Sequence, residues 1–455
     1  MEKLKKSLLY TYGIGDMFFV LMVCMEMYYF TAFLTDYALF PLETVRNLQI
    51  FTGVLDIGCA LFAGIMLQKI NLKFGGKYRS WLLIGPLPVA LLFTLQFTKI
   101  GSEMTAIIII ISTFVASHLI WNTITACSGS LVGRMTKETS EITILSTSRA
   151  QGMAAAGLLF SASGVPLIAF FSERAGRVAG MTLTVAVYGA MMILGYLYLY
   201  KMTAGKDPYD NEVRRPSQKQ AKISIAEVVR LVFRNRPLGM LAIAEIFRSS
   251  CVQLVAATAF YYFRYVRGDL DFMSVFLLIT AAASFMGATL ARWIGPRFGK
   301  RNTYWKALIC AGISYASSYF LGTTSLRFSL LIGLGALFLA VASGINTALY
   351  SDTVTYGEWK TGKNIRAFTM SLQNVAIKLS VLIRVSVLTF GLGAIGYIAN
   401  TDPSPQVVGG ISALMSFSPA VVCFIAAIIF FFGFKMQDSE MAKMREEIAS
   451  RTGAN

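Results

Sequence analysis

Charged residues are scarce in this chain, and their scarcity excludes a soluble globular protein. Only 14% of the 455 residues are Asp, Glu, Lys or Arg, whereas 55% are hydrophobic and the mean hydropathy is +0.60. A soluble protein of this length needs far more charge to cover its surface. Apolar segments of about 20 residues recur instead, and each can cross a hydrocarbon core roughly 30 Å thick as a helix. We therefore expect a multi-pass protein embedded in a lipid bilayer.

Metal ligands and catalytic groups are also rare. The chain has one histidine, His118, and its six cysteines lie in apolar segments without metal-ligand spacing. We interpret the cysteines as small buried thiols: Cys24, Cys59, Cys127, Cys251, Cys310 and Cys423. A lone histidine on an apolar span more often packs against its neighbours than relays protons. The sequence holds no catalytic constellation, so we expect neither an enzyme nor a bound metal or cofactor.

Acidic residues are outnumbered, since 24 Asp and Glu stand against 41 Lys and Arg, and the net charge is +17. The basic residues are dispersed over short connections without a nucleic-acid-binding module, which excludes nucleic acid as a partner. They alternate onto one side of the membrane, as the positive-inside rule requires. We expect a plasma (cytoplasmic) membrane protein with both termini in the cytoplasm. The apolar stretch after Lys6 is too long for a signal peptide, so the first span should be retained.

Hydropathy predicts an all-α protein with twelve transmembrane helices. The spans lie near residues 8–34, 45–69, 80–98, 104–131, 147–172, 179–201, 236–263, 272–294, 303–321, 327–350, 365–395 and 409–435. One long polar connection divides them six and six. The predicted parts are an N-terminal half at 1–201, a cytoplasmic central loop at 202–235, a C-terminal half at 236–435 and a cytoplasmic tail at 436–455. Residues 223–234 have helical apolar spacing and are expected at the membrane surface.

Two short segments resemble each other at equivalent places in the two halves. Residues 74–81 (Phe-Gly-Gly-Lys-Tyr-Arg-Ser-Trp) follow the second span, and residues 298–305 (Phe-Gly-Lys-Arg-Asn-Thr-Tyr-Trp) follow the eighth. Related six-helix halves packed about a central cavity, with the solute site near the midplane, are the major facilitator layout.

Four charged residues interrupt four different apolar spans: Asp16, Asp56, Arg149 and Lys378. A charge at the centre of a bilayer costs roughly 2.5–3.5 kcal/mol on insertion scales, so it is kept only with a partner or a water-filled cavity. These four residues predict a polar chamber inside a helix bundle. Such a chamber is typical of a protein that moves a solute.

Further charges lie on the predicted spans. Glu245 and Arg248 are three residues apart, so they either pair on one helix face or leave Arg248 to bind solute. Arg384 has no partner nearby in sequence and is a second candidate for the cavity. Glu26 is offset by about 80° from Asp16 on a regular helix, which favours a structural or modulatory role.

Several motifs lie at consistent distances along the chain. They are Tyr-Gly-Ile-Gly-Asp at 12–16, Tyr-Tyr at 28–29, Thr-Asp at 35–36, Arg149, Asn-Arg-Pro-Leu at 235–238, Ser-Asp-Thr-Val-Thr-Tyr-Gly-Glu-Trp-Lys-Thr-Gly-Lys at 351–363, Lys378 and Gly-Tyr at 396–397. Together, from about residue 10 to about residue 400, they resemble the glycoside–pentoside–hexuronide:cation symporter family of the major facilitator superfamily, which is melibiose-carrier-like. The 351–363 run is the most specific match.

The resemblance implies that Asp16 and Arg149 bind the sugar through its hydroxyls. A carboxylate that accepts and a guanidinium that donates in a fork suit that role. Trp121 is a further candidate, because its face can stack on a sugar ring, although aromatic residues in spans more often pack. The resemblance also places Asp56 in the cation site, with Lys378 approaching it from the other half.

This sequence departs from the family at the cation site. The family has a second aspartate one helical turn after the residue matching Asp56, and this chain has Ala60 there. On the fourth span, the position of an acid in the family is occupied by Thr125. Because sodium needs several oxygen ligands, we expect coupling to a proton through Asp56, Glu26 or Glu245. Alternatively Lys378 replaces the cation, leaving an uncoupled uniporter or exchanger.

We interpret residues 351–363 as a cytoplasmic loop whose side chains latch the inward gate. The gate candidates are Asp352, Tyr356, Glu358, Lys360 and Lys363. The arginine that the family has after Gly-Lys is Asn364 here, with Arg366 nearby, so the latch is expected to be rearranged.

We therefore predict a monomeric transporter that moves a sugar derivative by alternating access. Arg248 and Arg384 favour an anionic glycoside, such as a hexuronide, because arginine binds carboxylate, sulfate and phosphate through two parallel bonds. A lysolipid or amphiphile carrier is an alternative within the same class. A non-transporting membrane sensor is a further alternative, but the tail of about 20 residues argues against it.

Overall fold

The computed structural model describes residues 4–70, 72, 74–136, 138–207, 235–361, 366–436 and 438–452. Within these residues the regular secondary structure is entirely helical. Ten of the described helices are long and apolar enough to cross a membrane, with hydropathy windows between 1.5 and 2.4. The predicted all-α membrane architecture is therefore confirmed. The expected surface helix at 223–234 and the gate residues Lys363 and Asn364 lie outside the described residues.

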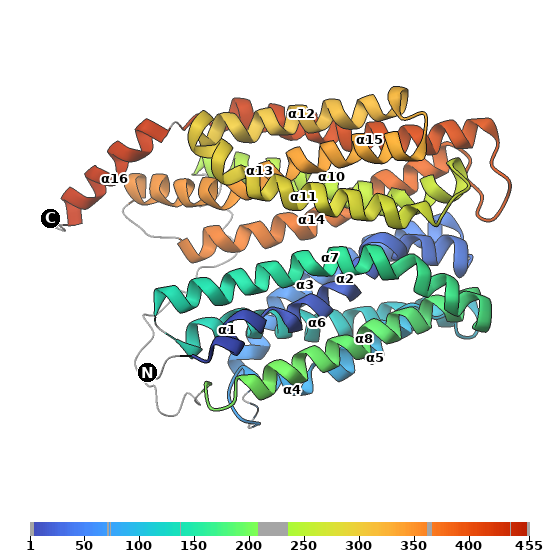
Figure 1. Ribbon diagram of the computed structural model, residues 1–455, viewed down its shortest axis with the longest axis horizontal. Coiled ribbons are helices and arrows are strands. Elements are labelled where there is room, and N and C mark those ends of the chain that lie inside the picture. Colours follow the sequence, from blue (N-terminus) through green and yellow to red (C-terminus); the bar gives the residue numbers. More distant parts are fainter. Residues whose placement is uncertain are drawn as a thin grey trace. The chain divides into compact units, whose positions relative to one another are not determined.

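The chain divides into two compact units, of which the first comprises Met1–Arg215, Asp269–Leu278 and Ile398–Asp402. In it α2 packs against both α7 and α8, and α6 packs against α3 and α5 (Figure 1). Its helices are α1 (Lys6–Thr11), α2 (Ile14–Ala32), η1 (Phe33–Tyr37), α3 (Leu42–Lys69), α4 (Arg79–Ile84), α5 (Pro86–Gln96), α6 (Glu103–Met135), α7 (Thr139–Ala175) and α8 (Arg177–Met202).

The second unit comprises Pro216–Gly268, Ile279–Tyr397 and Pro403–Asn455. Here α12 packs against α13 and α15, and α10 packs against α14 and α15. The helices that follow the central connection are α10 (Arg236–Tyr261), η3 (Tyr262–Val266), α11 (Phe272–Phe298), α12 (Lys300–Leu321), α13 (Ser325–Thr361), α14 (Arg366–Ala394), α15 (Pro405–Gly433) and α16 (Asp438–Thr452).

The structure corrects three expectations from the sequence. The third span is two helices, α4 and α5, that meet at Gly85, because the ring and missing N–H of Pro86 interrupt a continuous helix. The run that begins at Ser351 is helical as far as Thr361 and forms the end of α13, since it contains no proline. Cys310 is exposed, whereas the other five cysteines are buried thiols.

The internal repeat corresponds to a shared interaction in the two units. The Nη2 atom of Arg79 donates to the Tyr200 carbonyl at 2.6 Å, in the last turn of α8. The Nε atom of Arg301 donates to the Phe434 carbonyl at 2.6 Å, directly after α15 ends. Each arginine thus neutralises unpaired carbonyls at the negative end of a helix. Both helices are the sixth predicted span of their half, so the two segments perform the same task.

Small residues let α2 and α7 touch backbone to backbone. A Cβ atom on Gly152 would lie 2.3 Å from the Gly13 carbonyl oxygen, and one on Gly13 would lie 2.0 Å from the Ser148 oxygen. The Ser148 hydroxyl accepts from the Gly13 amide at 3.0 Å and donates to the Tyr10 carbonyl at 2.9 Å. Such close approach is the usual way in which membrane helices pack. It brings the start of α2 against the helix that carries Arg149.

We expect Gly152→Ala to destabilise the first unit by about 1–3 kcal/mol, because its methyl group must push α2 away from α7. Gly133→Ala is the matched control, since a Cβ atom on Gly133, in α6, meets nothing within 4 Å. Thermal unfolding of the purified protein in detergent measures both variants. Equal melting temperatures for the two variants would contradict the proposed backbone contact.

Candidate solute-binding site

Asp16 is the centre of a buried polar cluster in the first unit. It lies in the first turn of α2, where the helix dipole favours a carboxylate, and it is 0% exposed. Its Oδ2 atom accepts from Arg149 Nε at 2.6 Å, and its Oδ1 atom lies 3.4 Å from the Tyr196 hydroxyl. The Ser128 hydroxyl approaches the two carboxylate oxygens at 3.2 and 3.1 Å. Three helices other than its own therefore supply its donors.

A further hydrogen bond in the same cluster positions Ser128, one of the donors to Asp16. The Tyr12 hydroxyl, one turn before Asp16, donates to the Ser128 carbonyl at 2.8 Å. This bond ties α6 to the start of α2 beside the carboxylate. Because all of its donors come from the protein, Asp16 is held as the anchor of Arg149 in this conformation. Its direct contact with a sugar stays a prediction.

The Arg149 guanidinium is bonded to protein at one edge and partly exposed at the other. Its Nε atom bonds Asp16, whereas its side chain is 19% exposed. Within the described part of the chain, its two terminal nitrogens make no hydrogen bond to protein. A Cβ atom on Gly129, in α6, would lie 3.2 Å from Nη1, so the missing side chain leaves room there. The arginine is thus oriented at one edge and open at the other.

Trp121 belongs to an aromatic stack along α6. It lies 5.1 Å from the His118 ring at an interplanar angle of 7°, and its edge meets Phe19 of α2 at 4.3 Å. Phe93 of α5 packs beside it at 5.4 Å. Trp121 is nevertheless half-buried rather than buried. The structure therefore shows the packing role, and stacking on a sugar ring stays a prediction.

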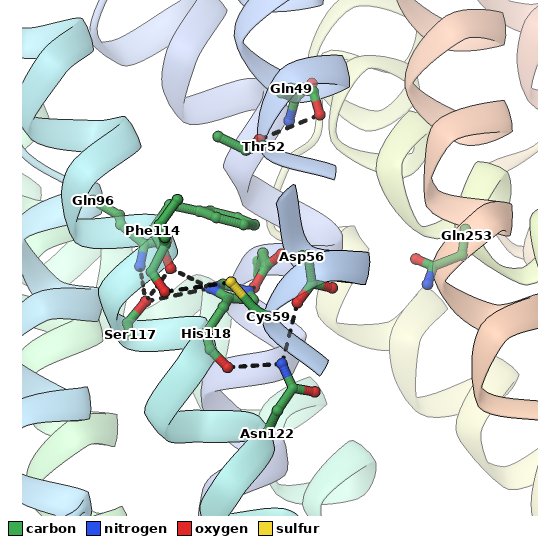
Figure 2. Close-up of polar contacts among 12 residues, drawn as sticks. Gln49, Thr52, Asp56, Cys59, Gln96, Phe114, Ser117, His118, Asn122 and Gln253 are labelled. Atoms are coloured by element: carbon green, nitrogen blue, oxygen red, sulfur yellow. Dashed lines mark hydrogen bonds and ion pairs between the residues drawn. The ribbon is translucent and has the colours of Figure 1, made fainter. Parts of the chain in front are cut away.

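Asp56 of α3 is bound by a residue that the sequence did not indicate. Asn122 Nδ2 donates to Asp56 Oδ1 at 3.3 Å and to the His118 carbonyl at 2.7 Å, as Figure 2 shows. The hydroxyl of Thr125, which occupies the position of the family's acid on the fourth predicted span, donates to the Trp121 carbonyl at 2.9 Å. Lys378 is half-buried on α14, in the other unit. The predicted coupling role of these residues remains a prediction.

The second unit holds its own buried charges. Arg248 donates from Nε to Glu245 Oε2 at 2.7 Å, and the Tyr304 hydroxyl lies 3.2 Å from the same oxygen. The predicted pairing on one helix face is confirmed, so the Arg248 guanidinium is already engaged by protein. Arg384 is 4% exposed and donates from Nη1 to Gln253 Oε1 at 3.4 Å. No group of three His, Cys, Asp or Glu among the described residues is placed to hold a metal ion.

These buried charges lie in a fold shared with characterised carriers. A family model described as MFS/sugar transport protein matches residues 11–438. The chain belongs to this family. It is 27% identical to the putative sulfoquinovose importer of Salmonella typhimurium, over 97% of this chain and 92% of that protein. It is also 27% identical to the glucuronide carrier protein homolog of Escherichia coli, over 97% and 94% of the two chains.

The fold is shared with the crystal structure of a D-xylose-proton symporter, at a TM-score of 0.66 and 12% identity over 94% of this chain and 97% of the other. This likeness confirms the predicted major facilitator fold. Membership of the MFS/sugar transport protein family confirms a multi-pass membrane transporter for a sugar-type solute rather than an enzyme. The resemblance to glycoside–pentoside–hexuronide:cation symporters is confirmed with it.

The predicted gate residues of this MFS/sugar transport protein lie at the end of α13. Asp352 is buried and forms an ion pair with Lys300 at the start of α12. Lys360 lies over the Tyr356 ring, with Nζ 5.7 Å from the centroid. Glu358 is half-buried on the same helix. The end of α13 is therefore tied to α12 by charge, and the role of this contact in gating stays a prediction.

The sequence interpretation did not indicate three residues that bind the buried aspartates: Ser128, Tyr196 and Asn122. Asn122 had a signal, since it is the only asparagine in the fourth predicted span and an amide in hydrocarbon needs partners. Ser128 and Tyr196 had none, because serine and tyrosine are common in spans and their partner lies on another helix.

We expect Asp16→Asn to cost about 3–5 kcal/mol, because it leaves the Arg149 charge half-buried without its counterion. The double variant Asp16→Asn/Arg149→Gln should recover a large part of that loss, since no unpaired charge remains. Thermal unfolding of the two single variants and the double variant measures the coupling. Losses that simply add would show that the two side chains do not stabilise each other.

Proposed function

We propose that this protein is a secondary transporter for an anionic sugar derivative. It moves the solute across the plasma membrane by alternating access, works as a monomer with both termini in the cytoplasm, and couples transport to a proton without a bound cofactor. The observation that supports this solute class is the open edge of the Arg149 guanidinium.

The geometry of Arg149 favours a planar or tripodal anion. Its two terminal nitrogens are oriented by the Asp16 bond to Nε, and no hydrogen bond to the described part of the protein occupies them. Two parallel N–H donors match the two charged oxygens of a carboxylate or sulfonate, whereas a hydroxyl offers a single uncharged acceptor oxygen. The sequence interpretation assigned this role to Arg248 and Arg384. Glu245 already holds the Arg248 guanidinium, and Arg384 is buried and donates to Gln253. Arg149 is the better candidate.

The names of two relatives agree with this chemistry. Sulfoquinovose carries a sulfonate and a glucuronide carries a carboxylate, so both named solutes are sugars with an anionic group. Transfer of this property to the present chain is part of the proposal, since the identity to each relative is 27%.

Proton rather than sodium coupling is supported by the surroundings of Asp56. Its Oδ1 atom accepts from the Asn122 amide, and the position one turn later is Ala60, which offers no side-chain oxygen. A hard cation requires several oxygen ligands in place of such donors. A titratable carboxylate requires only one proton.

We expect uptake into proteoliposomes to follow the anionic group of the solute. Methyl glucoside, methyl glucuronide and sulfoquinovose share a glucose frame and differ chiefly at carbon 6, so competition among them isolates the charge. The two anions should compete with each other and exclude the neutral glycoside. Undiminished uptake of methyl glucoside in excess methyl glucuronide would contradict the proposal.

Gly129→Ala tests the role of Arg149 without removing it. The added methyl group crowds Nη1 at 3.2 Å while the Asp16–Nε bond can stay in place. We expect the KM for methyl glucuronide to rise about 10-fold or more, because a charge-assisted hydrogen bond contributes about 1.5–3 kcal/mol. Gly133→Ala, on the same helix but in open space, is the control and should leave the KM unchanged. An unchanged KM in Gly129→Ala would remove Arg149 from the solute site.

A further inference from the structure

His118, the only histidine of the chain, joins α6 to α2 through a carboxylate. Its Nε2 atom lies 3.3 Å from Glu26 Oε2, and the two side chains are 5% and 19% exposed. His118 lies near the middle of α6, with Phe114 stacked on its ring at 3.7 Å. Within the described part of the protein, Glu26 has no other ion-pair or hydrogen-bond partner. Phe114 thus covers one face of the imidazole with an aromatic ring.

The other ring nitrogen faces an acceptor. His118 Nδ1 lies 3.0 Å from the Phe114 carbonyl oxygen, which can only accept. The neighbouring Ser117 hydroxyl donates to the same carbonyl at 3.0 Å and accepts from Gln96 Nε2 at 2.6 Å. Figure 2 shows these contacts of Ser117 beside the imidazole. The Ser117 hydroxyl lies farther from Nδ1, at 3.3 Å, than the Phe114 carbonyl does. A hydrogen on Nδ1 satisfies the nearer of the two, so the geometry favours a protonated Nδ1.

The Nε2 side then needs a second proton. A neutral imidazole carries one hydrogen, and Nδ1 uses it. Nε2 would face a carboxylate oxygen of Glu26 lone pair to lone pair unless a proton lies between them. The pair is therefore either imidazolium with carboxylate or imidazole with carboxylic acid. Both forms have zero net charge, which is the arrangement that a buried, weakly solvated site favours.

The other groups around the pair fit this assignment. From α3, Asp56 and Cys59 lie toward His118 (Figure 2), and Asp56 is bound to the Asn122 amide. From α5, the contacts are Gln96 and Phe93, which do not titrate. Arg149 of α7 faces Gly129, about three turns farther along α6. None of these described groups supplies a cation that would replace the shared proton.

The pair is also linked to the candidate solute site. The His118 ring stacks on Trp121 at an angle of 7°, and the His118 carbonyl accepts from the Asn122 amide that binds Asp56. A change in the charge of the pair therefore acts on both residues through direct contacts. Since binding linkage is reciprocal, solute binding changes the proton affinity of the pair by the same factor.

We infer that Glu26 and His118 together form the site that binds the coupling proton. The inference rests on the proposed function, and it moves the proton from Asp56, the residue that the family resemblance implied, to a pair of α2 and α6. The proton enters from water on one side and leaves to water on the other. No covalent step is involved. Asp56 then acts as a positioning residue that holds Asn122 against His118.

The protonation state can be read directly, because the chain has one histidine. Nitrogen NMR of the full protein, labelled at histidine and reconstituted in lipid nanodiscs, reports both ring nitrogens across a pH titration. We expect Nδ1 to carry a hydrogen at every pH and Nε2 to share one with Glu26 near neutral pH. Glu26→Gln should abolish the shared proton. A neutral ring with its hydrogen on Nε2 and a bare Nδ1 would overturn the assignment.

The coupling role is tested in proteoliposomes with an internal pH dye. Solute counterflow needs no coupling, whereas proton movement driven by solute does. We expect Glu26→Gln and His118→Gln to lose proton movement at least 10-fold and to keep counterflow of the anionic sugar. Glu43→Gln is the matched control, because Glu43 is 77% exposed on α3 and should behave as the unaltered protein.

The outcomes separate the two proposals. Wild-type protein without counterflow for any sugar tested would overturn the proposed function and the coupling role together, while the NMR titration still decides whether the pair holds a proton. Counterflow without proton movement in the wild type would overturn the coupling role of the pair and the proposed proton coupling, and it would leave the proposed solute class in place. Proton movement kept in Glu26→Gln but lost in Asp56→Asn would return the coupling site to Asp56.

Discussion

The ion pair between Asp16 and Arg149 is the interaction on which the first unit depends. A charge inside an apolar span must find its counterion on a neighbouring helix, so the two helices must approach closely at that level. Gly13 and Gly152 make this approach possible, because either one with a side chain would collide with the opposite backbone. The packing of α2 on α7 and the chemistry of the site therefore depend on the same requirement. Small residues next to the charged ones allow the two helices to come close enough.

The sequence predicted the parts of this constraint but not their assembly. Span positions follow from hydropathy, and the Glu245–Arg248 pair follows from helical spacing, because both are local properties. The bond from Arg149 Nε to Asp16, and the choice of Asn122 rather than Thr125 as partner of Asp56, depend on how helices face one another. Such facing is decided by rotation and depth of whole helices, which a single sequence does not encode in any short motif.

The errors have the same origin. The third span reads as one apolar run, and only the backbone chemistry of Pro86 divides it at Gly85. Residues 351–361 read as a loop because they are polar, although polar residues continue a helix readily once it has left the membrane. In the repeat, by contrast, weak similarity was informative. Arg79 and Arg301 cap corresponding helices in the two units. The two segments therefore share a capping contact rather than a run of identical residues.

The Asp16–Arg149 pair and the Glu26–His118 pair of the first unit differ in what they can bind. Arg149 is neutralised at Nε and open at its terminal nitrogens, so it can accept an anion without leaving a bare buried charge when the site empties. The Glu26–His118 pair is neutral only when it holds a proton. The resemblance implies a family cation site built from two aspartates, and this chain has Ala60 in place of the second. Removing an oxygen ligand weakens a sodium site but leaves a proton-holding pair untouched, so a change of coupling ion requires no new charge in the membrane.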